Sequence, residues 1–175
     1  MGLVHRLDRN TSGVVLLART SKAASRLSAR FRSDEVTKVY LAVVAGRPDP
    51  AEGELVSYLA GKGDRQGVTR ASTTPFSGAR ESRLRYNVRE SAAGLSLVEV
   101  RPVTGRRHQI RAQFALAGHP LVGDVKYGSR ERLSGHRIAL HAYKLAVAHP
   151  IRNEEGERPM VFEAATPPDW PWPPG

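Results

Sequence analysis

A carboxylate that could do chemistry lies between two arginines near the start of the sequence. Asp8 stands in the segment 5–13 (HRLDRNTSG), flanked by Arg6 and Arg9. Nearby positive charge favours the ionised form of an acid, and an ionised carboxylate can act as a nucleophile. A structural salt bridge is the alternative, because ion-pair networks also place acids among cations. These residues alone leave both interpretations open.

A second group of candidate residues lies in 104–118 (TGRRHQIRAQFALAG). Apolar residues recur there at helical spacing and a glycine follows them, at Ile110, Phe114, Ala117 and Gly118. Arg107 and Arg111 are four residues apart, so we expect them on one face of this helix. With the free N–H groups of the first helical turn they predict an anion site, for a phosphate or a carboxylate of the same chain. A solvated basic helix face is the alternative.

The elements that must position these residues follow from hydrophobic patterning. Two apolar runs predict buried strands at 14–18 and 38–45, and a basic amphipathic helix is expected at 22–31, capped by Thr20 or Ser21. Period-two alternation on either side of Gly94 predicts a hairpin. Its strands are expected at 84–88 and 95–100, and further strands at 138–147 and 160–162. A hairpin with one solvent-exposed face favours an antiparallel sheet. We therefore expect an α+β fold with a mixed, mainly antiparallel sheet flanked by helices and loops.

Two parts of the chain show little pattern. Residues 47–80 predict no clear element, and their glycine-rich stretch 61–67 (GKGDRQG) is interpreted as a mobile surface loop facing RNA, since it lacks the spacing of a phosphate-binding loop. The proline- and tryptophan-rich end, 166–175, is expected to be irregular.

Composition narrows the classes of function. The 175 residues fit one domain. A net charge of +10 favours a polyanionic partner such as nucleic acid, with an anionic membrane surface as the second choice. A basic protein without a particular ligand is the remaining alternative. Cysteine is absent, which excludes disulfides and thiolate–zinc sites and fits a reducing compartment. The six histidines show no HExxH spacing, so no metal site is expected. No apolar run approaches the roughly 20 residues of a membrane span, and we expect a cytoplasmic protein.

Six segments, in this order, resemble the RluA-type family of RNA pseudouridine synthases. They are HRLDRNTSG at 5–13, KVYLAVVAG at 38–46, TGRRHQIR at 104–111, GHPLVGD at 118–124, YG at 127–128 and LHA at 140–142. Arg107 departs from the pattern, since it stands where the family usually has Thr or Ser. Members of this family isomerise selected uridines in RNA without cofactor or metal. The resemblance implies the same activity here, with ribosomal RNA as the expected target and transfer RNA as the alternative.

The resemblance also implies a role for each matching residue. Asp8 would be the catalytic carboxylate, attacking either the ribose or the uracil ring, and Arg111 would pair with it and hold it ionised. Tyr40 would stack near the flipped uracil and assist the later proton transfer at C5. The substrate-binding residues would be Arg6, which would fill the gap left by the extruded base, and His5, Arg106, His108 and Gln109.

The domain boundaries and two other functions remain expectations. Relatives carry a segment upstream of the catalytic motif, so 1–165 is expected to be a catalytic domain lacking its N-terminal part, and 166–175 a tail. We expect a monomer. A basic RNA-binding module without catalysis is the alternative function. A glycosidase-like hydrolase would need a second acid, and Asp124, a turn residue after Gly123, is more simply structural.

Overall fold

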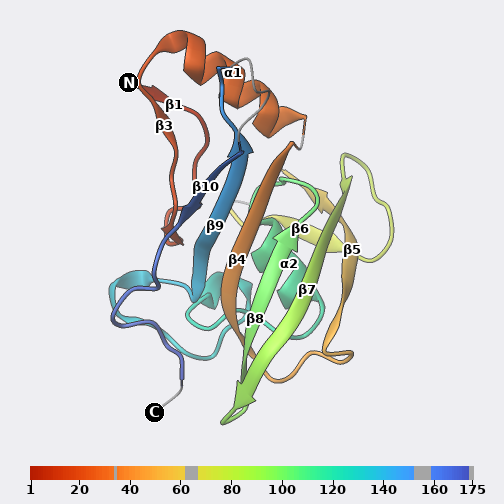
Figure 1. Cartoon of the computed structure of the whole chain (residues 1–175). Coiled ribbons are helices and arrows are strands. Elements are labelled where there is room, and N and C mark those ends of the chain that lie inside the picture. The colour runs from red at the N-terminus through yellow and green to blue at the C-terminus, as the bar shows by residue number, and fades with distance from the viewer. Residues whose placement is uncertain (34, 62–66, 152–158, 174–175) are drawn as a thin grey trace.

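The computed structural model describes residues 1–33, 35–61, 67–151 and 159–173 (Figure 1). Most elements of this described chain are strands. In chain order they are β1 (Gly2–Leu3), β2 (Ser12–Gly13), β3 (Leu17–Ala18), α1 (Ser21–Arg32), β4 (Val36–Ala45), β5 (Glu52–Ala60), β6 (Arg70–Ser72), β7 (Arg80–Ala92), β8 (Leu95–Pro102), α2 (Gln109–Leu116), the 3-10 turns η1 (Val125–Tyr127) and η2 (Ser134–His136), β9 (Leu140–Ala148) and β10 (Pro159–Glu163). None of the helices in these ranges is long and apolar enough to cross a membrane.

One large sheet carries the described part of the fold. Its strands run in the order β10-β9-β4-β8-β7-β5-β6, and all of these neighbours are antiparallel. The short strand β2 adds a parallel pairing to β9, which makes the sheet mixed. The expectation of a mixed, mainly antiparallel sheet in an α+β fold is therefore confirmed.

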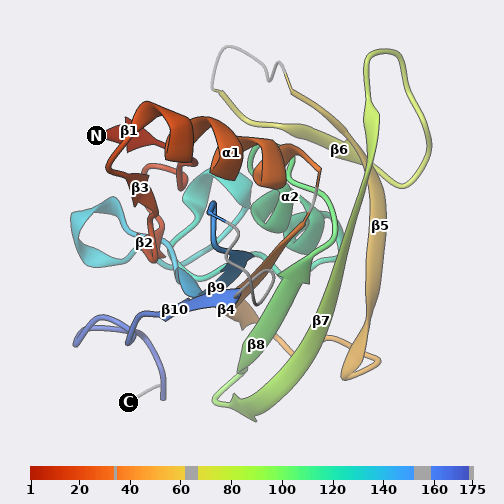
Figure 2. The ribbon, with the colours of Figure 1, turned by 45° about the horizontal axis from the view of Figure 1, so that its top comes forward.

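Both helices lie on the same face of this sheet (Figure 2). On β4, Ala42 and Val44 belong to the cluster under α2, whereas Val36, on the same face by strand alternation, belongs to the cluster under α1. Val43 points the other way and packs with Trp170 and Trp172 of the C-terminal tail. The two helices thus leave a gap between them over the middle of β4.

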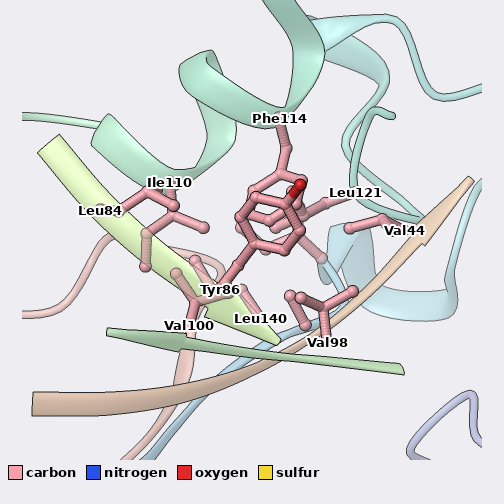
Figure 3. Close-up of a cluster of buried hydrophobic side chains, with 11 residues drawn as sticks. Val44, Leu84, Tyr86, Val98, Val100, Ile110, Phe114, Leu121 and Leu140 are labelled. Atoms are coloured by element: carbon pink, nitrogen blue, oxygen red, sulfur yellow. The ribbon is translucent and has the colours of Figure 1, made fainter. Parts of the chain in front are cut away.

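Helix α2 is anchored by its apolar side chains. Ile110 and Phe114 point from the helix onto the sheet, where Phe114 meets the ring of Tyr86 edge to face at 5.8 Å (Figure 3). Phe114 is 1% exposed, and full burial of such a side chain is worth about 1.5–3 kcal/mol. This packing holds α2 on the sheet and so sets the backbone position of Arg111 on the same helix.

The predicted helix at 22–31 and most predicted strands are confirmed. Thr20 caps α1, and its hydroxyl accepts a hydrogen bond from the Ala23 N–H at 3.2 Å. The hairpin turns through Ala93 and Gly94, both with positive φ, as a two-residue turn between strongly twisted strands requires. The tail that precedes residue 174 contains no helix or strand, as expected.

The buried strand expected at 14–18 is wrong. Strand β2, which pairs with β9, ends at Gly13 before the run, and residues 14–16 belong to no strand. Only Leu17 and Ala18 pair, as β3 with β1, and Val15 and Leu17 are exposed. The close approach of β2 to β9 explains the break. Gly13 has φ of 119°, and a Cβ there would lie 2.3 Å from the carbonyl oxygen of Ala142, so only glycine fits.

Residues 47–80 are more ordered than the sequence suggested. They contain β5 and β6, and β5 pairs with β7 along its length. The inward and outward positions of β5 alternate, but a polar residue, Ser57, is buried at an inward position and an apolar one, Val56, is 41% exposed at an outward position. This exchange conceals the strand from a hydrophobicity pattern. Of the glycine-rich stretch predicted to be a mobile loop, residues 62–66 lie outside the described residues.

Candidate active site

A cavity of about 250 Å³ lies in the gap between the two helices. Asp8 lines it from the loop between β1 and β2, Tyr40 from β4, and Arg111 from α2. The pairing of β4 with β9 is irregular at Val39 and Tyr40. Such bulges often re-aim side chains beside functional sites. The structure thus brings together the three residues predicted to be catalytic, from three distant parts of the chain.

Asp8 reaches the cavity from a tight turn. The N–H of Thr11 donates to the Asp8 carbonyl oxygen at 3.0 Å, which closes the turn. The Asp8 side chain is 28% exposed, and its Oδ2 lies 3.6 Å from Nη1 of Arg111 and 4.0 Å from Nε2 of His108. The carboxylate therefore faces positive charge and keeps an open side toward the cavity.

Arg111 has a closer partner than Asp8. Its Nε and Nη2 donate to the two carboxylate oxygens of Asp124, at 2.6 and 2.8 Å, and its guanidinium lies over the ring of Tyr127 at 4.8 Å. Burial lowers the pKa of Arg111, but the hydrogen bonds and charge of Asp124, with the charge of Asp8, outweigh it and raise the pKa overall. Asp124 and Tyr127 thus hold Arg111 so that its remaining nitrogen, Nη1, faces Asp8.

Sequence reasoning missed Asp124 and Tyr127 as residues of the site. Both lie in segments that matched the family, but a carboxylate after a glycine suggested only a turn. The burial of Asp124 indicates its role, since its side chain is 1% exposed and lies beside that of Arg111, which is 7% exposed. Gly123, with φ of 84°, permits the turn, because a Cβ there would lie 2.5 Å from the carbonyl oxygen of Arg137.

The expectation that Arg107 and Arg111 share a helix face is wrong. His108 has a left-handed backbone (φ 51°), so α2 begins only at Gln109 and Arg107 precedes it. Arg111 is buried, which also excludes the solvated basic helix face. The partner of Arg111 is a pair of carboxylates of the same chain, one of the two ligand classes expected for it.

His108 lies between the Asp8 carboxylate, 4.0 Å from its Nε2, and the loop at Thr69. The Thr69 N–H donates to the Tyr127 hydroxyl oxygen at 2.7 Å, and this oxygen lies 2.9 Å from Nδ1 of His108. Burial lowers the pKa of His108, as do Arg111 and Arg107, while Asp8 opposes them, so the ring is neutral near pH 7. If the Tyr127 hydroxyl donates to Nδ1, both the Thr69 N–H and the Tyr127 hydroxyl have an acceptor. The proton of the neutral His108 ring is then on Nε2, the nitrogen that faces Asp8.

Tyr40 is a hydrogen-bond donor at neutral pH. Burial, followed by the negative charge of Asp8, raises its pKa to about 12. The hydroxyl therefore remains protonated over the whole range in which the protein would be assayed. In that state it can donate to a bound group but is a poor proton acceptor.

The predicted substrate-binding residues occupy two kinds of position. Arg6 and Arg106 are exposed at the cavity, and neither side chain has an ion pair within the described chain. By contrast, His5 and Gln109 are engaged in the fold. His5 accepts the Leu16 N–H through Nε2 at 3.0 Å, and Gln109 is 4% exposed. Gln109 binds Thr104, the Arg106 N–H and the Arg83 carbonyl oxygen.

A wide basic groove continues from this cavity. It has a volume of about 1410 Å³ and is lined by Arg6, Arg9, Arg106, Arg107, Arg111, Lys126 and Arg132. Its carboxylates, Asp8 and Asp124, both face Arg111. The groove therefore presents an excess of positive charge, which suits the backbone of a nucleic acid.

These features define an α+β domain with a carboxylate–arginine site at the end of a basic groove, and comparison with known proteins assigns it to a family. A model of the family described as RNA pseudouridylate synthase matches residues 1–116. The chain is 35% identical over 168 residues to ribosomal large subunit pseudouridine synthase C of Vibrio cholerae, covering 93% of this chain and 52% of that protein. It is 38% identical over 163 residues to dual-specificity RNA pseudouridine synthase RluA of Escherichia coli, covering 92% and 71%.

A solved structure agrees with these relatives. The structure titled human RNA pseudouridylate synthase domain containing 4 superposes with a TM-score of 0.76 at 25% identity, covering 95% of this chain and 72% of that one. The chain belongs to the RNA pseudouridylate synthase family. It spans about half the length of the Vibrio cholerae relative.

Proposed function

We propose that the chain isomerises selected uridines of RNA to pseudouridine, with Asp8 as the catalytic carboxylate. The observation that carries the proposal is the placement of Asp8 in a cavity opposite Arg111, an arginine fixed by a second, buried carboxylate. Ribosomal RNA is the proposed target and transfer RNA the alternative. The names of two relatives support this order, since one refers to the large ribosomal subunit and the other to dual specificity.

The reaction conserves atoms. The bond between N1 of uracil and C1′ of ribose breaks, a bond between C5 and C1′ forms, C5 loses a proton and N1 gains one. Asp8 forms a transient covalent bond to one of the two halves, the ribose or the uracil ring, and this bond breaks again before the product is released. Either attack needs an ionised carboxylate. Arg111 supplies the positive charge that favours this ionised form.

The surrounding residues have supporting roles. The target base must leave its stack to enter a cavity of about 250 Å³, which costs a few kcal/mol and least in unpaired loops. Arg6 lies exposed at the cavity, where its side chain can fill the gap left by the base. The Tyr40 ring lines the cavity beside the base. Its protonated hydroxyl can give a proton to N1, and the phenolate so formed can take the proton that leaves C5.

Tritium release from RNA labelled at C5 of uridine tests the proposal, because the reaction expels that hydrogen. We expect release from bulk bacterial RNA by the purified chain and a loss of more than about a thousandfold in Asp8→Asn, a near-isosteric amide that is not a nucleophile. Release that persists in Asp8→Asn would refute the role of Asp8. Salt-dependent RNA binding without release, from a chain folded by circular dichroism, would favour an RNA-binding module instead.

A further inference from the structure

A second cavity, of about 280 Å³, lies on the other side of the loop that carries Asp8. Its walls are the loop 9–12, the segment 133–138 and the C-terminal tail at 167–171. We propose that this cavity binds a nucleobase of the RNA strand that flanks the target uridine. The proposal rests on the proposed function for the identity of the strand, and it adds a recognition site beyond the site of chemistry.

The second cavity lies next to the candidate active site. Thr11 lines both cavities and forms part of the wall between them. The second cavity also shares lining residues with the basic groove, namely Arg9, Asn10, Leu133, Gly135 and Ile138. The groove in turn contains Asp8 and Arg111. A strand that places one base against Asp8 and runs along the groove therefore reaches the second cavity.

The cavity has the chemistry of a base-binding site. Trp170 lines it and is half-buried, and its ring meets that of His141 at 5.8 Å. His141 is itself held by Ser12 and by the Ala164 carbonyl oxygen, at 2.8 and 2.9 Å, so this support is fixed. Fixed aromatic rings beside a positively charged groove are the usual means of binding single-stranded bases.

Polar groups at the cavity can read the edge of a base. Asn10 lines the cavity, and its amide offers both a donor and an acceptor. Arg9 adds an exposed cation at the junction with the groove, where a phosphate would pass. Arg137 and Asp169 form an ion pair at the rim, so Arg137 contributes little net charge there. Aromatic, amide and cation together favour a nucleobase with its phosphate over an apolar ligand.

The chain contains two tryptophans, which gives matched reporters for the experiment. Trp172 packs in the same tail, but its indole N–H donates to Glu90 at 3.0 Å and it does not line the cavity. In W172F the remaining Trp170 should change its fluorescence when polyuridylic acid is added, whereas in W170F the remaining Trp172 should not. Inorganic polyphosphate, which has charge but no bases, should leave the Trp170 signal unchanged.

Catalysis supplies the second readout. We expect W170A to raise KM for C5-tritiated bulk RNA about tenfold with kcat nearly unchanged, the scale expected for loss of one stacked base, and W172A to leave KM unchanged. If W170A fails to fold, the fluorescence of W172F decides the question. The proposal would be overturned if the fluorescence of Trp170 stayed unchanged when polyuridylic acid binds, or if it changed equally with polyphosphate. Absence of tritium release by the wild type would refute the proposed function alone, since the fluorescence test needs no turnover.

Discussion

The two sides of the candidate active site are held in different ways. On the α2 side, Arg111 is buried, makes two short hydrogen bonds to Asp124 and lies on Tyr127. On the other side, Asp8 is 28% exposed, and its nearest cation, Nη1 of Arg111, lies 3.6 Å from its Oδ2. The positive charge is therefore fixed by the fold, while the carboxylate keeps room to approach a substrate. This division suits a nucleophile that must form a bond while its electrostatic partner stays in place.

The largest expected effect on stability comes from removing the partner of Arg111, and it can be compared with the same change at Asp8. Asp124→Asn leaves Arg111 buried with Asp8 as its remaining counter-charge, and should lower the free energy of unfolding by about 3–5 kcal/mol. Asp8→Asn, at a half-exposed position, should change it by less than about 0.5 kcal/mol. Urea denaturation followed by circular dichroism measures both values. Similar losses in the two variants would mean that the two sides are held equally firmly.

Tyr127→Phe should have an intermediate effect. The variant keeps the ring under Arg111. It removes the hydroxyl that accepts a hydrogen bond from the Thr69 N–H and lies within hydrogen-bond distance of His108 Nδ1. We expect a loss of about 1–2 kcal/mol in the free energy of unfolding, because a partly buried donor is left unpaired. Tyr143→Phe is the matched control, since no hydrogen bond of its hydroxyl is found within the described residues.

NMR can follow the same variant at His108. In the wild type the ¹⁵N shifts should identify the tautomer with its proton on Nε2, and in Tyr127→Phe this preference should weaken. A wild-type ring with its proton on Nδ1 would contradict the assigned direction of the Tyr127–His108 hydrogen bond.

The same contrast explains what the sequence could predict. Helix α1, strand β4 and the β7–β8 hairpin are encoded locally, by a cap, an apolar run and a turn, and each was predictable. The loss of the strand expected at 14–18 was not predictable, because it depends on the pairing of Gly13 with Ala142 before the run and of Leu17 with Leu3 within it. Strand β5 was concealed by a serine that faces inward and a valine that faces out.

The site divides in a similar manner. Motif resemblance placed Asp8, Tyr40 and Arg111 in one site, and the structure brings them to one cavity. The bond that fixes Arg111 joins a helix to a turn 13 residues away, and neither residue shows a local sign of burial. A carboxylate that would be costly to bury alone is buried here because Arg111 is buried with it and pairs with it. Only the assembled fold reveals such a pair.

A smaller effect is expected from pH, through His5 beside the Asp8 loop. Burial, followed by the charge of Lys38, lowers the pKa of His5, and its Nε2 must be unprotonated to accept the Leu16 N–H. The unfolded chain then binds the proton more readily than the folded one. The stability that neutral His5 supports is complete above the ordinary histidine pKa of about 6.5 and is lost as the pH falls below it.

Thermal unfolding at a series of pH values checks this sign. The Tm should fall between pH 7.5 and 5.5 in the wild type, and the fall should be smaller in His5→Gln, which keeps an acceptor that does not titrate. Since the pKa of His108 is also lowered, His108→Gln serves as the companion variant and should remove a separate part of the fall. A Tm that rises as the pH falls would contradict the assigned direction for both rings.

The smallest effect should come from Arg107, at the outer edge of the α2 side. Its side chain is exposed in the basic groove and donates to the Gly67 carbonyl oxygen at 3.2 Å, so little stability depends on it. Arg107→Thr, which introduces a residue usual in the family, should change the free energy of unfolding by less than about 0.5 kcal/mol. It should still reduce the slope of log affinity against log salt by about 1, because one phosphate contact is lost.

Filter binding of bulk RNA at several salt concentrations measures that slope. Arg47→Thr is the matched control, an exposed arginine that does not line the groove, and it should leave the slope unchanged. An unchanged slope in Arg107→Thr would exclude this residue from the RNA path. A large loss of stability would instead show that its hydrogen bond to Gly67 helps to fix the α2 side of the site.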